Sequence, residues 1–252
     1  MSDVAVVIVA AGKSTRFTGE SENHPTQLKK PFVSVRSRAL WLHSVDRFLR
    51  REDVKQLILV IAEEDQQMFQ ERFGAEVAIL SVDVVLGGSS RAESVLHGLR
   101  AVRKEIAFVA VHDAARPCIA DTWLDQLFAQ ARETGAAILA TPVVSTVKRV
   151  IDDSVDATVS REGLWESQTP QMFEKKKLLE AYEHSENYVQ ATDEAQLMEW
   201  FGHDVAVVPA SPLNRKVTTQ ADLQFVEIAL DLLPKKEIQS PSPSLDENGF
   251  WN

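Results

Sequence analysis

Short segments of small residues and cations follow the ends of apolar runs in this sequence. The first, AAGKSTRF at residues 10–17, comes directly after the apolar residues 4–9. Small residues let backbone N–H groups approach a phosphate closely, and Lys13 and Arg16 add positive charge. The segment predicts an anion site, with a plain turn carrying solvated cations as the alternative. A P-loop is excluded, because the first glycine of GxxxxGK[ST] would fall at Val7 inside the apolar run.

Two further segments have the same character, GGSSRAES at residues 87–94 and HDAARP at residues 112–117. Two glycines permit close approach to a base or ribose, and Ser94 can read polar edges. Asp113 is placed to contact Mg²⁺ or a ligand hydroxyl, and Arg116 to contact an anion. A capping aspartate and a surface arginine are the alternative for this last pair.

Several other chemistries find no support in the sequence. It contains no GxSxG elbow, no HExxH and no convincing Ser-His-Asp arrangement. The histidines, which are His24, His43, His97, His112, His184 and His203, show no metal-ligand spacing. We therefore expect His112 to orient its loop rather than to act in catalysis. The single cysteine, Cys118, excludes an intrachain disulfide and is expected to be a small buried residue.

The overall composition narrows the class of protein and of partner. The chain has 252 residues, 44% hydrophobic and 25% charged, which is ordinary for a globular protein. A net charge of -10 without a Lys/Arg run of five or more makes nucleic acid an unlikely partner. No basic region precedes the apolar run at 4–9, and no apolar stretch approaches the roughly 20 residues that span a bilayer. We expect a soluble cytoplasmic protein with no membrane partner.

In the N-terminal half, continuous apolar runs alternate with segments of helical period, which is typical of buried parallel strands joined by helices. The pattern predicts a doubly wound α/β fold with a mostly parallel sheet. Strands are expected at 4–9, 57–62, 82–86, 106–111 and 137–140, and helices around 42–49, 95–102 and 124–131. Asp121 is expected to cap the third helix and Gly135 to end it. Ligands of such sheets bind beyond the carboxyl ends of the strands, so the segments described above lie where a site is expected.

The pattern changes after Pro142. Residues 146–151 and 157–160 alternate in character around the turn residues 152–154, which indicates a protruding β-hairpin arm over about 142–171. Further elements are expected as helices at 174–184 and 192–201, a strand at 205–208, and a last helix that begins with a capping box of Thr219 and Asp222. Residues 1–233 are thus predicted to form a single domain. Residues 234–252 are rich in Ser, Pro and charge and are predicted to be a disordered tail.

Together with TVKR at 146–149, REGLW at 161–165, QTPQ at 168–171, ATDEA at 191–195 and KVT at 216–218, these segments resemble the methylerythritol phosphate cytidylyltransferase family in order and spacing. The resemblance covers residues 4 to about 230. It implies a Rossmann-like nucleotidyltransferase that transfers CMP from CTP to 2-C-methyl-D-erythritol 4-phosphate in non-mevalonate isoprenoid biosynthesis, with the arm forming a homodimer. The related ribitol 5-phosphate cytidylyltransferases share much of this pattern. They remain the alternative, and a non-catalytic nucleotide-binding protein is a more distant one.

The resemblance also implies roles for individual residues. Arg16 and Lys30 would stabilise charge on the CTP phosphates, and Arg161 and Lys216 would position the sugar phosphate, so these four form the implied catalytic set. CTP and its Mg²⁺ would be held by Ala10, Ala11, Gly12, Lys13, Gly88, Ser94, Asp113 and Ala114, with Asp113 as the metal contact. The acceptor side, which binds a small polyol phosphate, would be completed by Arg116, Thr146, Thr169, Thr192 and Asp193.

Three positions depart from the family pattern. The first loop reads KSTRF where additional glycine is usual, Pro31 follows Lys30 in place of glutamine, and Leu213 stands where an acidic residue is common. The implied reaction suits the remaining residues, because an acceptor phosphate oxygen is already anionic and needs no general base. It needs cations instead, to bring two anions together and to neutralise pyrophosphate as it leaves.

Overall fold

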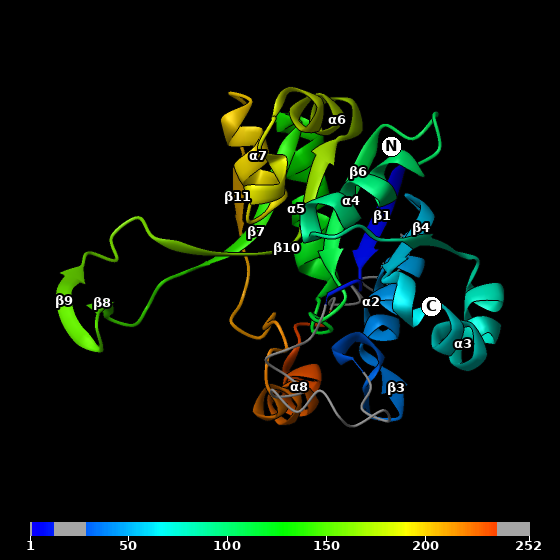
Figure 1. The fold of residues 1–252 in the computed structure, drawn as a ribbon, viewed down its shortest axis with the longest axis horizontal. Helices are drawn as coiled ribbons and strands as arrows, with labels where there is room; N and C mark the ends of the chain where they lie inside the picture. Colours follow the sequence, from blue (N-terminus) through cyan, green and yellow to red (C-terminus); the bar gives the residue numbers. More distant parts are fainter. Residues whose placement is uncertain (1, 13–28, 236–252) are drawn as a thin grey trace, which may run out of the picture.

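The computed structural model describes residues 2–12 and 29–235, which are organised around a seven-stranded sheet (Figure 1). Its strands, in spatial order, are β11 (Ala206–Pro209), β7 (Ala136–Pro142), β10 (Trp165–Glu174), β6 (Phe108–Asp113), β1 (Val4–Val9), β4 (Val54–Ile61) and β5 (Val82–Leu86). Lys13, Arg16 and residues 236–252 of the expected tail lie outside the described residues.

Most neighbouring strands pair in parallel, as expected. β1 pairs in parallel with β4 and β6, β4 with β5, and β7 with β11, whereas β10 is antiparallel to both β6 and β7. From β1 the chain order runs outward through β4 on one side and through β6 on the other. The carboxyl ends of β1 and β6 therefore form a topological switch point, where ligands of open α/β sheets bind.

The central strand β1 shows why a buried strand appears in the sequence as a continuous apolar run. Val4, Val6 and Ile8 belong to one hydrophobic cluster, and Ala5 and Val7 to another on the opposite face of the sheet. All five side chains are fully buried. Because successive side chains of a strand point to opposite faces, a strand covered on both faces is apolar at every position.

Helices cover both faces, which confirms the doubly wound α/β prediction. One face packs against α2 (Leu40–Leu49), α3 (Gln66–Leu80), α5 (Asp121–Thr134) and α8 (Gln220–Leu232), and the other against α4 (Arg91–Arg100), α6 (Lys175–His184) and α7 (Glu194–Trp200). Short 3-10 helices lie at η1 (Lys30–Phe32), η2 (Glu63–Asp65) and η3 (Tyr188–Gln190). None of the helices in the described ranges is long and apolar enough to cross a membrane.

The helix α4 lies unusually close to the sheet because of Gly98. A Cβ atom at this position would come 2.5 Å from Val7 Cγ1 and 2.9 Å from Val60 Cγ2. Ser90 caps α4 by accepting a hydrogen bond from the Glu93 N–H, and the Glu93 side chain completes the capping box. The start of α4 is thereby fixed beside the carboxyl ends of the strands.

The predicted helix signals are partly correct. Gly135 ends α5 with φ of 87°, and Thr219 and Asp222 form the expected capping box of α8. Asp193 caps α7 by accepting a hydrogen bond from the Gln196 N–H. Asp121 is not the cap of α5: it is the first helical residue, and Ala120 occupies the capping position without a side-chain hydrogen bond. Cys118 is buried as expected, and burial raises the pKa of its thiol to about 12.

Beyond β7 the chain forms a two-stranded arm, β8 (Val147–Ile151) and β9 (Ser154–Val159), which projects away from the sheet on the left of Figure 1. Asp152 and Asp153 have φ values of 47° and 60° and make the turn, as primed hairpin turns require. The returning segment differs from the prediction. Trp165–Glu174 is the sheet strand β10 rather than arm, so the expected arm of 142–171 ends before this strand.

Candidate active site

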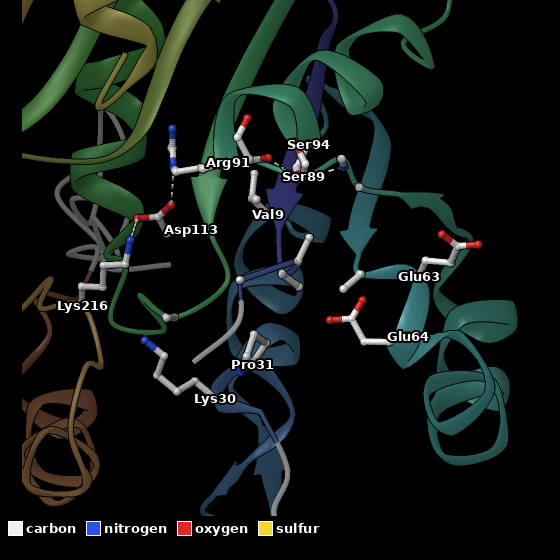
Figure 2. Close-up of a pocket in the computed structure, with 18 residues that line it drawn as sticks. Val9, Lys30, Pro31, Glu63, Glu64, Ser89, Arg91, Ser94, Asp113 and Lys216 are labelled. Atoms are coloured by element: carbon white, nitrogen blue, oxygen red, sulfur yellow. Dashed lines mark hydrogen bonds and ion pairs between the residues drawn. The ribbon is translucent and has the colours of Figure 1, made fainter. Parts of the chain in front are cut away.

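A cavity of about 770 Å³ opens at the carboxyl ends of β1, β4, β5 and β6 (Figure 2). Eight residues with expected roles line it together, namely Ala10, Ala11, Gly12, Lys30, Gly88, Ser94, Asp113 and Lys216. They come from the segment after β1, from η1, from the loop between β5 and α4, from the first turn of α4, from the end of β6, and from the segment before α8. The sheet thus brings segments spread over most of the chain to one edge.

Asp113 lines the cavity and lies close to three cations. Its Oδ2 lies 2.8 Å from Lys216 Nζ and 3.8 Å from Arg116 Nε, and its Oδ1 accepts a hydrogen bond from Arg91 Nε at 3.2 Å. Burial alone would raise the pKa of this carboxyl, but Arg91, Lys216 and Arg116 outweigh burial and hold its pKa well below the ordinary value. Asp113 is therefore ionised at every physiological pH.

Arg91 connects this carboxylate to a second one. Its Nη1 and Nη2 donate to the two oxygens of Glu194 at 2.9 and 3.1 Å. Glu194 is 1% exposed and also accepts a hydrogen bond from the Tyr182 hydroxyl. Burial opposes the charge of Arg91, but Glu194 and Asp113 together hold the pKa of its guanidinium above the ordinary value. The two carboxylates and the guanidinium form a fixed chain of charges.

His112 lies beneath the cavity and supports the loop. The Thr169 hydroxyl accepts a hydrogen bond from the Asp113 N–H at 3.0 Å and donates one to His112 Nδ1 at 3.1 Å. With Nδ1 as the acceptor, the proton is assigned to Nε2, which lies 3.1 Å from the Arg116 carbonyl. Burial lowers the pKa of His112 to about 3, so the ring is neutral. These contacts agree with the expectation that His112 orients its loop.

The loop between β5 and α4 is held by side chains from the first turn of α4. Ser94 Oγ accepts a hydrogen bond from the Gly88 N–H at 3.1 Å and donates one to the Ser90 carbonyl at 2.8 Å. A Cβ atom at Gly87 would come 2.7 Å from Ala11 Cβ, and one at Gly88 would come 2.5 Å from Glu93 Cβ. The two glycines therefore let this loop pack closely against the β1 segment and against α4.

Other expected site residues lie outside the cavity. Ala114 is buried in the core, and the Arg116 guanidinium donates to the carbonyls of Asn214 at 2.7 Å and Ser167 at 3.4 Å. Thr169 is 4% exposed. These three support the cavity wall from behind.

The remaining expected residues lie at α7 and on the arm. Asp193 accepts hydrogen bonds from the Ser167 hydroxyl and the Gln171 amide, and Thr192 lies beside it at the start of α7. Thr146 and Arg161 are exposed at the base of the arm, where Arg161 donates to the Val144 carbonyl. None of these four lines the cavity.

Two of the departures from the family pattern have a local explanation. Pro31 is the second residue of η1 and lines the cavity beside Lys30, and proline is tolerated in a first helical turn because no intrahelical N–H bond is lost there. Leu213 is partly buried and packs against the main hydrophobic cluster. The third departure, KSTRF, lies outside the described residues.

The described residues include one carboxylate well suited to a divalent cation. No group of three or more His, Cys, Asp and Glu side chains within 2–12 and 29–235 is arranged to hold a metal. A single ionised carboxylate nevertheless fits Mg²⁺ in a nucleotide site, where phosphate oxygens and waters supply the other ligands. Asp113 meets this requirement, because it is ionised and lines the cavity.

Sequence reasoning missed Arg91, Glu194, Glu63 and Glu64. Arg91 and Glu194 stand inside the segments GGSSRAES and ATDEA, but neither was assigned a role. Glu63 and Glu64 follow β4 and line the side of the cavity opposite Asp113 (Figure 2). The signal for the last two was available, since polar residues directly after a buried strand lie at the same edge as the other loops.

Comparisons with known proteins give matches that cover most of the chain. The family model described as "IspD: 2-C-methyl-D-erythritol 4-phosphate cytidylyltransferase" matches residues 4–231. The enzyme of that name from Rhodopirellula baltica is 37% identical over 241 residues, covering 91% of this chain and 96% of the relative. The one from Bacillus pumilus is 36% identical over 228 residues, covering 90% and 96%.

Solved structures give the same result. The 4-diphosphocytidyl-2C-methyl-D-erythritol synthase of Anaerococcus prevotii superimposes with a TM-score of 0.73 at 30% identity, covering 91% of this chain and 96% of that one. The 2-C-methyl-D-erythritol 4-phosphate cytidylyltransferase of Thermus thermophilus gives a TM-score of 0.73 at 27% identity, covering 91% and 99%.

Proposed function

This chain belongs to the 2-C-methyl-D-erythritol 4-phosphate cytidylyltransferase family of nucleotidyltransferases, and we propose that it transfers CMP from CTP to 2-C-methyl-D-erythritol 4-phosphate. The products are 4-diphosphocytidyl-2-C-methyl-D-erythritol and pyrophosphate. The observation that carries the proposal is the ionised Asp113, held between Lys216 and Arg91 at the switch point of the sheet. The identity of the acceptor is inferred from family membership. The arrangement of Asp113, Lys216 and Arg91 provides the charges that phosphoryl transfer requires.

In the proposed reaction, a phosphate oxygen of the acceptor attacks the α-phosphorus of CTP. A new P–O bond forms, the bond from the α-phosphorus to the oxygen bridging to the β-phosphorus breaks, and pyrophosphate leaves with that electron pair. The attacking oxygen is already anionic, so no side chain has to remove a proton. The buried, neutral His112 accordingly has no part in the chemical step.

The protein's own contribution is to place positive charge around two anions. Lys30 lines the cavity and would neutralise charge on the CTP phosphates, together with Arg16 from the segment outside the described residues. Lys216 would contact the acceptor phosphate at the place where the acceptor meets the nucleotide. Asp113 would hold a divalent cation such as Mg²⁺, which when bound neutralises phosphate charge as a Lewis acid. One preorganised charge of this kind lowers the activation free energy by about 3 kcal/mol, which raises the rate roughly a hundredfold.

The loops would bind the nucleotide through their backbones. Ala10, Ala11 and Gly12 would lie against the phosphates, with Lys13 beyond the described residues, and Gly88 and Ser94 would lie against the base or ribose. On the acceptor side, Thr192 and Asp193 are held at the start of α7. Ala114, Arg116 and Thr169 would act from behind the cavity wall by holding its loops.

The arm supports the proposal of a homodimer. Val144, Val150 and Val155 are 71%, 57% and 63% exposed, and a second copy of the chain would cover them. Thr146 and Arg161, which do not line the cavity of their own subunit, would then complete the acceptor side of the partner's cavity. We further propose that residues 1–233 act as one domain and that the enzyme works in the cytoplasm.

Pyrophosphate release tests the proposed function directly. CTP, 2-C-methyl-D-erythritol 4-phosphate and Mg²⁺ should give one pyrophosphate per acceptor consumed, and none should appear without acceptor. UTP should be a poor donor, because groups matched to the amino edge of cytosine would be left unpaired by uracil. Faster turnover with ribitol 5-phosphate would transfer the protein to that sister activity. Absence of turnover with both acceptors would contradict the proposal.

A further inference from the structure

We propose that Glu194 is a positioning residue for nucleotidyl transfer, because it fixes Arg91 and through Arg91 the carboxylate of Asp113. This inference rests on the proposed function. It assigns a role to a buried carboxylate that reaches the cavity only through another side chain. Glu194 belongs to α7, and its link to the cavity joins residues 103 positions apart in the sequence.

The guanidinium of Arg91 bridges Glu194 and Asp113. The guanidinium is planar and has one edge, Nη1 and Nη2, bound to the two oxygens of Glu194. That bidentate contact fixes the plane and leaves Nε to meet Asp113 Oδ1 at 3.2 Å. The orientation of Asp113 at the cavity therefore depends on where Glu194 holds the far edge of Arg91.

Glu194 is itself held rigidly. The Tyr182 hydroxyl from α6 donates to its Oε1 at 3.3 Å. The start of α7 is bound to β10, since Gln171 Oε1 accepts the Ala195 N–H and Gln171 Nε2 donates to Asp193. These contacts hold the carboxylate in place before any ligand binds, as a positioning residue requires.

Glu194 also balances part of the positive charge around Asp113. Asp113 stands close to three cations, which are Arg91, Lys216 and Arg116. Glu194 supplies the second carboxylate of this cluster and leaves one net positive charge. Without Glu194, the guanidinium of Arg91 would have Asp113 as its only carboxylate partner. It would then compete with a metal–nucleotide complex for the Asp113 oxygens. Glu194 thus keeps Asp113 available to the ligand.

The decisive variant is Glu194→Gln, which keeps the size of the side chain and removes its charge. Loss of a residue that orients a ligand-binding carboxylate reduces affinity or activity by about 10- to 100-fold, and we expect that loss in kcat/KM for CTP. Glu199→Gln is the matched control, because Glu199 is exposed on the same helix and should leave kcat/KM unchanged. Equal rates for the wild type and Glu194→Gln would overturn the inference.

A double-mutant cycle separates positioning from a merely structural role. If Glu194 acts through Asp113, Glu194→Gln should have little further effect in an Asp113→Asn background. Effects that multiply would show that Glu194 and Asp113 act independently and would overturn the inference. Thermal unfolding of each variant monitors the fold. Should Glu194→Gln fail to fold, Tyr182→Phe removes only the hydroxyl contact to Glu194 and should lower kcat/KM by about two- to tenfold. An unchanged Tyr182→Phe enzyme would then overturn the inference.

A binding measurement makes the test independent of turnover. CTP with Mn²⁺ is titrated calorimetrically into the wild type and Glu194→Gln without acceptor, and the variant should bind about tenfold or more weakly. Equal affinities would contradict the positioning role. A wild type that binds CTP but releases no pyrophosphate would count against the proposed function, while the two affinities would still decide the role of Glu194.

Discussion

The ammonium group of Lys216 lies 2.8 Å from the carboxylate of Asp113, although the two residues are 103 positions apart. Two contacts bring the Lys216 segment there. The Val217 N–H donates to the Ala115 carbonyl at 2.8 Å, and the Asn214 amide donates to the Thr169 carbonyl at 2.9 Å. A residue expected to serve the sugar phosphate therefore stands directly at the carboxylate expected to serve CTP.

This contact changes what should be expected of Lys216→Ala. We predict that it raises KM for both CTP and the acceptor, because Asp113 loses a partner and the acceptor phosphate loses a cation. Lys30→Ala should instead lower kcat by about a hundredfold with a smaller effect on acceptor KM, since its charge is assigned to the transition state. Initial rates with each substrate varied in turn measure both effects. Identical kinetic profiles for the two variants would refute this division of roles.

The proposed crossing of arms predicts recovery of activity from two inactive parents. Lys30→Ala and Arg161→Ala chains are mixed, denatured and refolded. In a mixed dimer with shared sites, one cavity receives both defects and the other receives none. Random pairing makes half of the dimers mixed, so about a quarter of wild-type activity should return. No recovery, with mixed dimers verified by mass spectrometry, would show that Arg161 does not serve the partner's cavity.

Gly98 and Gly74 should respond oppositely to replacement by alanine. Gly98→Ala should destabilise the protein by about 1–3 kcal/mol, because the new Cβ would meet Val7 and Val60 in the packed sheet. Gly74→Ala in α3 should be neutral or stabilising by up to about 1 kcal/mol, since the new Cβ meets only the flexible end of Gln70. Thermal or urea unfolding of both variants checks this. A Gly98→Ala protein as stable as the wild type would contradict the close packing of α4.

Asp222 should stabilise the protein in a pH-dependent way. Burial alone would raise its pKa, but the N–H and hydroxyl groups of Thr218 and Thr219 hold the pKa below the ordinary value. A carboxyl with a lowered folded-state pKa stabilises the fold above its unfolded pKa of about 3.9, and this contribution is lost as the pH falls below that value.

Asp222→Asn should therefore cost about 2 kcal/mol at pH 7. The difference from the wild type should shrink below about pH 4. Urea unfolding at pH 7, 5 and 3.5 measures it. Asp231→Asn is the matched control on the same helix, because Asp231 is exposed and its pair with Arg36 is a surface one. A difference that stays constant over this pH range would refute the argument.

The sequence predicted the buried strands well and the marginal helix poorly. β1 has the predicted bounds, because its continuous apolar run is typical of a strand that is buried on both faces. The edge strand β5 also has the predicted bounds, although Val82 is the only one of its five residues that is buried. The helix α3 was not predicted. Phe69 and Phe73 are the only buried residues of α3, and Ile79 is 80% exposed, so the apolar stripe of this helix is too weak to stand out in the sequence.

Strand β10 and the Arg91–Glu194 pair show a second limit of prediction from the sequence. Gln168, Thr169 and Gln171 are buried polar residues inside β10, and their polarity made a central strand look like part of an exposed arm. Each is satisfied by partners from distant segments, such as Asn214 and His112. Side-chain pairs of this kind depend on the tertiary fold, and no local periodicity encodes them.

The position of β10 has a consequence for synthesis on the ribosome. β6 and β7 emerge first, yet they are joined only through β10, which is translated after the arm. A nascent chain that stops before residue 165 therefore holds the four strands β6, β1, β4 and β5 and, apart from them, the unpaired strand β7, because β11 is also translated later. β10 also carries Thr169, whose hydroxyl accepts the Asp113 N–H. Translation of this one strand joins β7 to the rest of the sheet and brings Thr169 to the Asp113 N–H in the same event.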